Sequence, residues 1–551
     1  MTASARAEPG VDHAALHSLA LGRRQLGDLE LIMSGAFAPL RGFMTEADVR
    51  AVAASGTLAD GTAWPIPVTL ECRSDAVPPD AGHVLLADPE GTPLAVLRIT
   101  ERTVLGAPDP AGGDPASGVP ADRDPAITGP AGGTMIRLAG PVTAHRPAEH
   151  GPFRRLMISP EQARAKLGTG PVLAFATRAP LGWRQIGQLK HLAGQLSARL
   201  LLLPLTGGQA QVVRQPEDLV RAVLAAAASL PAGTLVVPVP LAPRPADGAA
   251  PPGRPEPVRE LAAAAIVAAA HGATHLMADG WLPAGRDGRA AGAVITGLPG
   301  APIPVVAAGE WAYDQRAEVW RPLSLIEPGA EIGDLSADQL ADMLDSGACL
   351  PDWFAPEAVR AELRRARPPR SERGLVLFLT GLSGSGKSTL ARDLHDILSE
   401  RGERRVSLLD GDLVRSLLSA GLSFSRADRD LNIARIGYVA AEIARHGGIA
   451  ICAPIAPYAA ARQRVREMVC QAGDFLLIHV ATPIEVCEAR DRKGLYAKAR
   501  AGLIERFTGI SDPYEEPTDA VLTIDTSVLS REQAVNAVLG LLTSGGWLAG
   551  G

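Results

Sequence analysis

Residues 381–388, Gly-Leu-Ser-Gly-Ser-Gly-Lys-Ser, limit what this 551-residue chain can fold into more than any other feature. They match the pattern G-x-x-x-x-G-K-[ST] and lie between an apolar run, LVLFLT, and a helical pattern that begins with STLARDL. Glycines let backbone N–H groups turn inward around phosphate oxygens, and the following helix adds the positive end of its dipole. The motif therefore predicts a strand, a phosphate-binding loop and a helix within an α/β domain.

Short apolar runs alternate with helical patterns after residue 374, which predicts a parallel sheet with helices on both faces. The predicted strands are 375–380, 406–410, 449–453, 475–480 and 521–525. Residues 152–345 alternate in the same way, with predicted strands at 172–176, 199–203, 235–239 and 274–279. The first 150 residues instead contain short runs and turns, which indicate a mostly β unit. The expected fold class is therefore α/β with a β-rich amino end.

Stretches rich in proline mark the expected boundaries. Two combine proline with glycine, at 106–133 and 241–257, and a third, RRARPPRSER at 364–373, directly precedes the strand of the glycine-rich loop. The expected domains are a β-rich domain at 1–150, an α/β domain at 151–363, a linker at 364–373 and a second α/β domain at 374–545.

Composition narrows the classes of partner. The formal net charge of −6 argues against a general nucleic-acid binder. The longest uninterrupted apolar stretch, 261–270, is half of what a bilayer span requires, and the start MTASARAEPG lacks the apolar core of a secretory signal. We therefore expect a cytoplasmic protein that acts on small molecules, with no nucleic-acid or membrane partner.

Lysine is rare, since only five of the 54 basic residues are lysines, and three of those five are Lys387, Lys493 and Lys498. In the loop motif, Lys387 is expected to reach the β- and γ-phosphates of a nucleotide and Ser388 to ligate Mg²⁺. The other two lie in RDRKGLYAKAR at 490–500, where five cations surround a glycine. Such a segment suggests a lid that closes over phosphates, and a solvated surface run is the alternative.

Two further patterns carry chemistry. Asp410 and Asp412 stand at the end of the second predicted strand, where carboxylates at i and i+2 point toward one side, at the edge that binds ligands. One could order hydrated Mg²⁺ while the other accepts a proton from an attacking hydroxyl, and an Asp-Gly turn that caps a helix is the alternative. Arg429, Asn432 and Arg435 recur on one helix face, which could clamp an anion or face solvent.

These motifs, in this order over nearly all of residues 373–545, closely resemble the adenylylsulfate (APS) kinase family. The matching segments are GLSGSGKST, LDGDLVR, LSFS, DRDLNIARIG, IAPY, EVCEARDRKGLYAKAR and FTGISDPYE. The resemblance implies a P-loop α/β kinase that transfers the γ-phosphoryl group of ATP to the ribose 3′-hydroxyl of APS. The implied products are PAPS and ADP, the implied cofactor is Mg²⁺, and the implied process is sulfate activation.

The resemblance also implies roles for individual residues of this chain. Asp412 would be the base near the 3′-hydroxyl, and Ser388 and Asp410 would lie at the metal. The implied catalytic residues are Lys387, Asp410, Asp412, Lys493 and Lys498. The implied ATP contacts are Gly381, Ser383, Gly384, Ser385, Gly386, Lys387, Ser388, Thr389 and Arg490. The implied APS contacts are Asp412, Arg415, Phe424, Arg429, Asn432, Ile455, Lys498 and Phe507, with the two phenyl rings stacking on the adenine.

The first half resembles ATP sulfurylase, the enzyme that makes APS from ATP and sulfate. Residues 25–44, WPIPVTL and LSADQLADML match its framework in order. The resemblance implies a PUA-like β domain followed by a Rossmann-like nucleotidyltransferase domain.

Its active-site positions differ from the family pattern. The family has Q-T-R-N-P-x-H-x-x-H where residues 176–185 read ATRAPLGWRQ, so Gly182 and Gln185 replace both histidines. The family's G-R-D-H is DGWL at 279–282, with a displaced GRD at 285–287, and its Ser-Gly-Thr is SAD at 336–338. Imidazoles would steady the phosphate charge during adenylyl transfer. We therefore expect a degenerate sulfurylase-like half with little or no activity.

The sequence thus predicts an APS kinase fused to an inactive sulfurylase-like half. One alternative is a bifunctional PAPS synthase, in which Arg178, Arg184 and His275 compensate for the lost histidines. Another is a regulatory protein that senses a nucleotide without turnover, although an intact Lys387 and Asp412 argue against it. Both families commonly assemble, so we also expect a homo-oligomer.

Overall fold

The computed structural model describes residues 16–105, 134–147, 151–208, 212–244, 256–279 and 292–549, apart from residues 297, 299, 424, 492 and 505. The side chains of Glu256, Asp412 and Leu413 also lie outside this description. Over the described residues the chain divides into two compact units, 1–338 with 350–363 and 339–349 with 364–551. We find no helix within these ranges whose length and hydrophobicity would let it span a bilayer. The boundaries expected from composition stay predictions.

The amino-terminal part of the first unit is a mostly antiparallel sheet, as its short apolar runs predicted. Its strands follow the order β1-β4-β5-β7-β2, and β3 and β6 also pair with β7. The bounds are β1 (Ser18–Ala20), β2 (Gly42–Phe43), β3 (Leu70–Arg73), β4 (His83–Ala87), β5 (Pro93–Arg98), β6 (Glu101–Leu105) and β7 (Met135–Ala144), with helices α1 (Arg23–Met33) and α2 (Glu46–Ser55).

A parallel sheet in the order β10-β9-β8-β11-β12 follows in the same unit, together with a small antiparallel sheet, β14-β13-β15. The parallel strands are β8 (Val172–Thr177), β9 (Arg199–Pro204), β10 (Leu235–Val236), β11 (His275–Ala278) and β12 (Val305–Ala307). The antiparallel strands are β13 (Trp311–Asp314), β14 (Val319–Pro322) and β15 (Glu331–Ile332). The helices are η2 (Arg154–Leu156), α4 (Pro160–Leu167), α5 (Trp183–Leu196), α6 (Pro216–Ala227), α7 (Glu256–Ala270) and η3 (Leu323–Leu325). Most of α9 (Glu357–Ala366) also belongs to this unit, whereas most of α8 (Ala337–Ser346) belongs to the second.

The second unit contains a parallel sheet in the order β17-β18-β16-β19-β20. Its strands are β16 (Leu375–Thr380), β17 (Val406–Asp410), β18 (Ile449–Ala453), β19 (Asp474–Val480) and β20 (Leu522–Ile524). Its helices are α10 (Lys387–Arg401), α11 (Gly411–Leu417), α12 (Arg426–Arg445), α13 (Ala459–Cys470), α14 (Ile484–Arg490), α15 (Leu495–Arg500) and α16 (Arg531–Ser544). The predicted α/β class is confirmed, and each predicted strand of this unit agrees to within one residue at either end.

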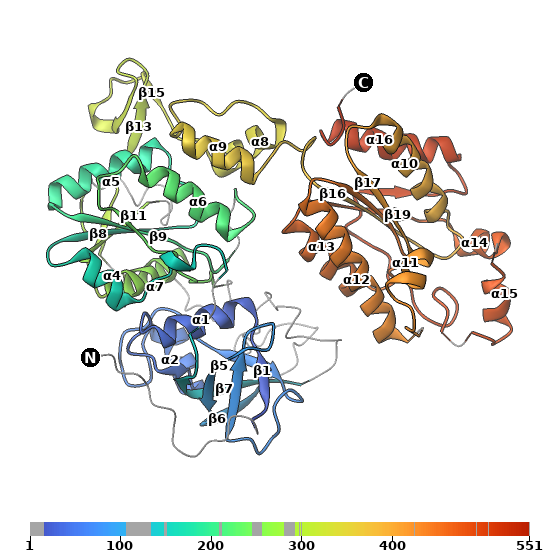
Figure 1. Cartoon of the computed structure of the whole chain (residues 1–551), viewed down its shortest axis with the longest axis horizontal. Coiled ribbons are helices and arrows are strands. Elements are labelled where there is room, and N and C mark those ends of the chain that lie inside the picture. The colour runs from blue at the N-terminus through green and yellow to red at the C-terminus, as the bar shows by residue number, and fades with distance from the viewer. Residues whose placement is uncertain are drawn as a thin grey trace. The chain divides into compact units, whose positions relative to one another are not determined.

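Helices cover both faces of this sheet (Figure 1). Along β16, Leu375, Leu377 and Leu379 pack with α10 and α16, whereas Val376 and Phe378 pack with α12 and α13. Successive side chains of a strand point to opposite faces, so a strand covered on both faces must be apolar throughout. The glycine-rich loop therefore leaves the sheet from a fully buried central strand.

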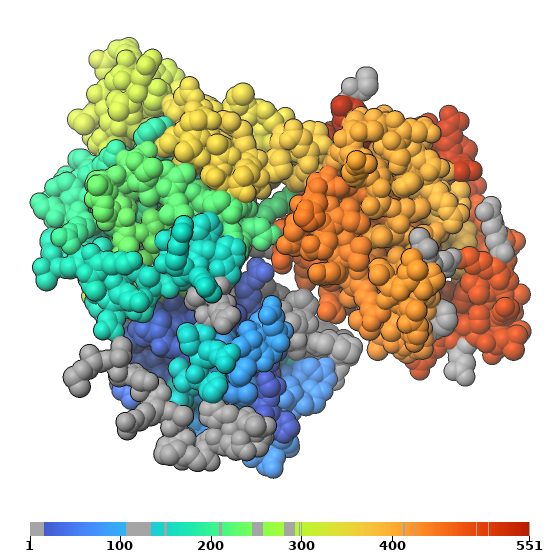
Figure 2. Space-filling view, in the orientation of Figure 1, coloured from blue at the N-terminus to red at the C-terminus, as the bar shows by residue number. Residues whose placement is uncertain are grey.

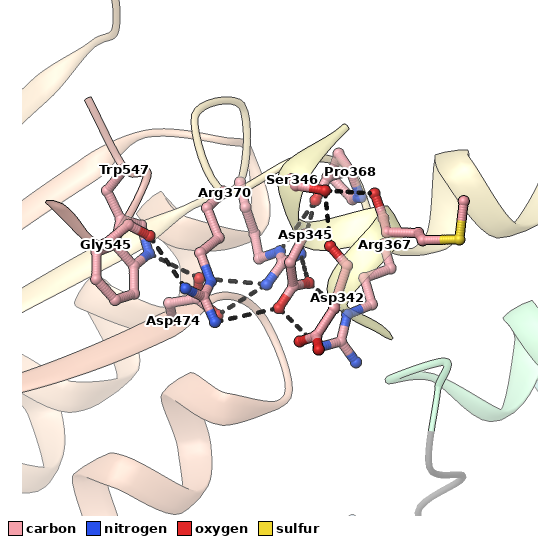
Figure 3. Close-up of polar contacts among 11 residues, drawn as sticks. Asp342, Asp345, Ser346, Arg367, Pro368, Arg370, Asp474, Gly545 and Trp547 are labelled. Carbon is pink, nitrogen blue, oxygen red and sulfur yellow. Dashed lines mark hydrogen bonds and ion pairs between the residues drawn. The ribbon is translucent and has the colours of Figure 1, made fainter. Parts of the chain in front are cut away.

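Ion pairs within the second unit hold α8 beside the segment at 364–373 (Figure 3). The Asp345 carboxylate accepts hydrogen bonds from Arg367 Nε at 2.6 Å and Nη2 at 2.9 Å, and another from Arg373. Arg370 Nη2 lies 3.3 Å from the same carboxylate. The Asp345 side chain thus binds three arginines of the segment 364–373, which its composition predicted to be a linker.

The cluster reaches the central sheet. Arg373, which is buried, also pairs at 3.3 Å with Asp474 at the start of β19. The indole Nε1 of Trp547 donates to Asp474 at 2.8 Å, and Arg370 donates to the carbonyl of Gly545 at 3.0 Å. Through these bonds, α8, the sheet and the chain after α16 are joined (Figure 3).

We expect Asp345→Asn to lower the free energy of unfolding of the second unit by about 3 kcal/mol, because it removes the shared counter-charge of buried Arg373 and of the partly exposed Arg367 and Arg370. Burial raises the pKa of the Asp345 carboxyl, but hydrogen bonds from Arg367 and Arg373 outweigh burial and hold it well below its usual value. The carboxylate's contribution is therefore present above about pH 4 and lost as pH falls toward the folded-state pKa.

Denaturant unfolding at several pH values checks this prediction. The difference between the variant and the unchanged protein should be largest at pH 7 and shrink as pH falls below 4. Glu372→Gln, at an exposed carboxylate beside the cluster, is the matched control. Equal stability of the Asp345→Asn and Glu372→Gln proteins at pH 7 would contradict the proposed contribution.

Candidate active site

The glycine-rich loop has a backbone that only glycine accommodates at two positions. Gly381 has φ +148°, and a Cβ there would lie 2.4 Å from the carbonyl oxygen of Val480. Gly386 has φ +104° and caps the start of α10. Thr526 Oγ1 donates to the carbonyl of Ser385 at 2.8 Å and so fixes the loop from the end of β20. The loop directs α10 with its positive end toward the loop's interior, as phosphate binding requires.

Lys387 and Ser388 open α10 beside the end of β17. Lys387 is buried, and its Nζ donates to the carbonyl of Leu382 at 2.6 Å. Ser388 Oγ lies 3.5 Å from Asp410 Oδ1, while Arg392 Nη2 pairs with Asp410 Oδ2 at 3.1 Å. A hydroxyl, a carboxylate and an ammonium thus stand at one end of the sheet.

The two carboxylates do not share a strand, so the interpretation from their spacing was wrong. β17 ends at Asp410, and α11 begins at Gly411, which places Asp412 in the first turn of a helix. A glycine directly after the strand ends the run of residues that favour extended backbone. The side chain of Asp412 and the whole of Phe424 lie outside the described residues.

Arg429 is buried in α12 and bonds to the segment at 506–512. Its Nη1 donates to Thr508 Oγ1 at 3.1 Å and to Asp512 Oδ2 at 2.6 Å, and its Nη2 donates to the carbonyl of Arg506 at 2.9 Å. Tyr458 Oη donates to the same Asp512 oxygen at 2.6 Å. These bonds fix the segment that carries Phe507.

Asn432 and Arg435, which were predicted to share one face of α12 with Arg429, have different environments. Asn432 is buried, and its Oδ1 accepts no hydrogen bond from any described residue. A buried amide oxygen without a donor is costly, so a ligand that donates here would be favoured. Arg435 donates to the carbonyl of Leu418 at 2.7 Å, and Arg415 to the carbonyl of Ser423 at 3.4 Å. The face is not uniformly solvated.

The remaining predicted residues differ in their surroundings. The Ile455 carbonyl accepts from Thr380 Oγ1 at 2.6 Å, at the end of β16. Arg490 donates to Thr526 Oγ1 at 2.7 Å and to the Thr526 carbonyl at 2.9 Å. Lys493 and Lys498 are exposed in the segment that carries α14 and α15, which forms a lobe at the lower right edge of the second unit in Figures 1 and 2.

In the first unit, the positions that the sequence marks as altered lie at the start of α5. A Cβ on Gly182 would lie 2.6 Å from the carbonyl oxygen of Phe354, so the neighbouring backbone occupies the space that a side chain would need. Gln185 Oε1 accepts the backbone N–H of Gly182 at 3.0 Å, and the Trp183 N–H donates to the Phe354 carbonyl at 2.9 Å. Residues 280–291, including the displaced GRD, lie outside the described residues.

Arg184 and Arg178 have different surroundings. Arg184 binds Asp279 through Nη1 at 2.5 Å and Nη2 at 2.9 Å, and binds Asp334 through Nε at 2.7 Å. Arg178 lies 3.9 Å from Glu260, and its buried Nε and Nη1 make no hydrogen bond to any described residue. Burial lowers the pKa of Arg178.

Comparisons with known proteins agree with this arrangement. The chain is 36% identical to the sulfate adenylyltransferase of Chaetomium globosum, over 98% of this chain and 96% of that one. It is 37% identical to the sulfate adenylyltransferase of Phaeosphaeria nodorum, over 97% and 94%. The chain belongs to the sulfate adenylyltransferase family.

The family model Adenylylsulphate kinase matches residues 373–525, so this part of the chain is an APS kinase domain. The model PUA-like domain matches residues 1–105. A solved structure, the hexameric APS kinase from Thiobacillus denitrificans, is 34% identical and superposes with a TM-score of 0.68 over 97% of this chain and 95% of that one. Relatives of full length thus carry the name of either activity, and they give no support to an inactive first half.

Sequence reasoning missed several residues that hold this site together. Tyr458, Tyr496 and Asp512 bond to the elements just described, yet none was singled out. Tyrosine is as rare as lysine in this chain, with five of each. The scarcity that drew attention to Lys387 would have drawn attention to these tyrosines as well.

We expect Arg429→Lys to weaken APS binding by about tenfold, because an ammonium cannot bridge three acceptors in the geometry of a guanidinium. Titration calorimetry with APS measures the affinity directly. Arg445→Lys, at a half-exposed arginine that ends α12, is the control and should bind normally. Unchanged affinity of the Arg429→Lys protein would remove this residue from the site.

Proposed function

We propose that the second unit transfers the γ-phosphoryl group of ATP to the 3′-hydroxyl of APS, giving PAPS and ADP. The observation that carries the proposal is the joining of the glycine-rich loop, Asp410 and the Phe507 segment by direct contacts. The APS kinase domain supplies the reaction class, and the geometry supports the individual roles.

On the ATP side, backbone N–H groups of the loop and the start of α10 would bind the β- and γ-phosphates. Lys387 Nζ, held over the loop by the Leu382 carbonyl, is placed to follow the transferred phosphoryl group. Arg490, tied to Thr526, would border the nucleoside. Lys493 and Lys498 would add positive charge when the lobe closes over the phosphates.

The residues near Ser388 fit Mg²⁺. This ion keeps several waters and takes one or two protein oxygens besides phosphate oxygens, and the Ser388 hydroxyl and Asp410 carboxylate stand 3.5 Å apart. Bound there, Mg²⁺ would neutralise charge on the β- and γ-phosphates. Arg392 Nη2 pairs with Asp410 Oδ2 at 3.1 Å and so orients that carboxylate.

On the APS side, Asn432 would accept a hydrogen bond from the substrate, and Phe507 and Phe424 would stack on the adenine. Asp412 would take the proton of the 3′-hydroxyl as its oxygen bonds to the γ-phosphorus and ADP leaves. Arg415 and Arg429 would balance the phosphosulfate charge. The presence of Lys387 and Asp412 in the sequence favours turnover over nucleotide sensing.

Lys387→Ala should lower the rate of PAPS formation from ATP and APS by about 10³-fold or more, since it removes the cation nearest the transferred group. A coupled assay for ADP, with thermal unfolding to confirm the fold, measures the loss. Lys166→Ala, at an exposed lysine of α4, is the matched control. A Lys387→Ala protein with near-normal turnover would refute the assignment of the phosphate site.

A second candidate activity is adenylyl transfer from ATP to sulfate by the first unit. Two observations favour it: full-length relatives named sulfate adenylyltransferase, and the unused donors of buried Arg178. Of the residues expected to compensate for the lost histidines, Arg184 already binds Asp279 and Asp334, which leaves Arg178 and His275. The expectation of an inactive half rests on three altered segments, at 176–185, 279–282 and 336–338, and the relatives give it no support.

The assay compares ATP with APS against ATP with sulfate and pyrophosphatase. A chain with both activities forms PAPS in both mixtures, and Arg178→Ala should then stop the second reaction while sparing the first. PAPS from the APS mixture alone would discard the second candidate and restore the inactive half.

We also propose that the protein forms a homo-oligomer. The similar protein from Thiobacillus denitrificans is named a hexameric APS kinase, which supports this proposal.

A further inference from the structure

Tyr496 lies between the glycine-rich loop and the ring of Phe507. It is almost fully buried in α15. Its hydroxyl donates to the carbonyl oxygen of Ser383, within the glycine-rich loop, at 2.9 Å. The edge of its ring meets Phe507, with centroids 4.9 Å apart and planes at 75°.

The helix that carries Tyr496 is anchored at its start. The Asp491 carboxylate accepts the backbone N–H of Tyr496 at 3.1 Å and that of Ala497 at 3.0 Å. These bonds cap α15 and lower the pKa of Asp491. Because α15 also carries Lys498, the cap and the tyrosine together fix where that cation stands.

A small apolar cluster surrounds the tyrosine and is separate from the two cores that flank the sheet. It contains buried Cys487, Tyr496, Ala499 and Phe507, and Leu382 of the glycine-rich loop packs against it. One cluster therefore contains a residue of the nucleotide loop, two residues of α15 and the ring expected to stack on APS. A displacement of any one of these parts would be felt by the others, since packed interiors deform little.

The hydroxyl distinguishes this residue from a phenylalanine. A buried phenol needs a hydrogen-bond partner, and here the partner is a loop carbonyl rather than a neighbour in the same helix. Burial raises the pKa of the Tyr496 phenol, so it remains a donor throughout the neutral range. The bond therefore persists under assay conditions and fixes the loop from the APS side.

We propose that Tyr496 is a positioning residue that couples the ATP loop to the APS-binding ring, so that each substrate strengthens the binding of the other. The proposal rests on the kinase function proposed above. Ordering of the Phe507 ring by APS would hold Tyr496, and its hydroxyl would then hold the Ser383 carbonyl in the conformation that binds phosphate. By linkage, the effect of APS on nucleotide affinity must equal the effect of nucleotide on APS affinity.

The test measures this coupling in the full-length protein. Titration calorimetry gives the Kd of AMPPNP alone and with saturating APS, and the ratio of the two values is the coupling factor. For the unchanged protein we expect a factor of about five or more. In Tyr496→Phe, which keeps the ring contact and removes only the hydroxyl, the factor should fall below about two, whereas the Kd of AMPPNP alone changes little.

Tyr438→Phe, at an exposed tyrosine of α12, is the control and should keep the full factor. A Tyr496→Phe protein with an unchanged melting temperature and an unchanged coupling factor would overturn the proposal, as would a factor of one in the unchanged protein. Failure of the unchanged protein to bind APS would overturn the kinase function and, with it, this inference.

Discussion

Close approach to the backbone of one loop is the constraint on which the second unit depends. The carbonyl of Val480 at the end of β19, the backbone of Cys487 in α14 and the side chain of Thr526 after β20 all lie where a side chain on Gly381, Gly384 or Gly386 would stand. Since these glycines leave that space open, three chain segments can surround a single turn. The phosphate-binding loop and the segments around it thus pack as one structure, and this structure sets the positions of the predicted substrate-binding residues.

The sequence predicted the strands of the second unit well, for a physical reason. A strand buried on both faces is apolar without interruption, so β16 and β18 are visible as continuous runs. The helix after the loop was equally clear, because Leu390, Leu394 and Leu398 recur at helical spacing and are buried against the sheet.

Prediction failed where the outcome depends on contacts between distant residues or on one backbone turn. The spacing of Asp410 and Asp412 predicted a pair on one strand, whereas in the structure a helix begins at Gly411, between them. The bond from Arg429 to Asp512, which lies 83 residues further along the chain, could not be predicted either, and the role of Arg429 at APS stays a prediction. Local spacing carries no trace of such a bond. The same holds for Asp345, whose three arginine partners appear in the sequence only as a polar, proline-containing break.

The first unit shows how an altered site can keep its architecture. Its parallel sheet is complete among the described strands, and the start of α5 is capped by Gln185 and by the Phe354 carbonyl. Arg184 binds two carboxylates, whereas the buried Nε and Nη1 of Arg178 make no hydrogen bond to any described residue. The two neighbouring arginines therefore differ in what they could still bind.

The ion cluster at Asp345 limits where the second unit can be separated from the rest of the chain and passed on as a module. Its acid precedes Arg367 by 22 residues and belongs to a helix that the family framework counts with the upstream half. A gene fusion that began at β16 would keep Asp474 but would lose its partner Arg373 and the acid Asp345. The compact unit that contains the kinase sheet therefore begins at Gln339, well upstream of the glycine-rich loop by which such domains are recognised.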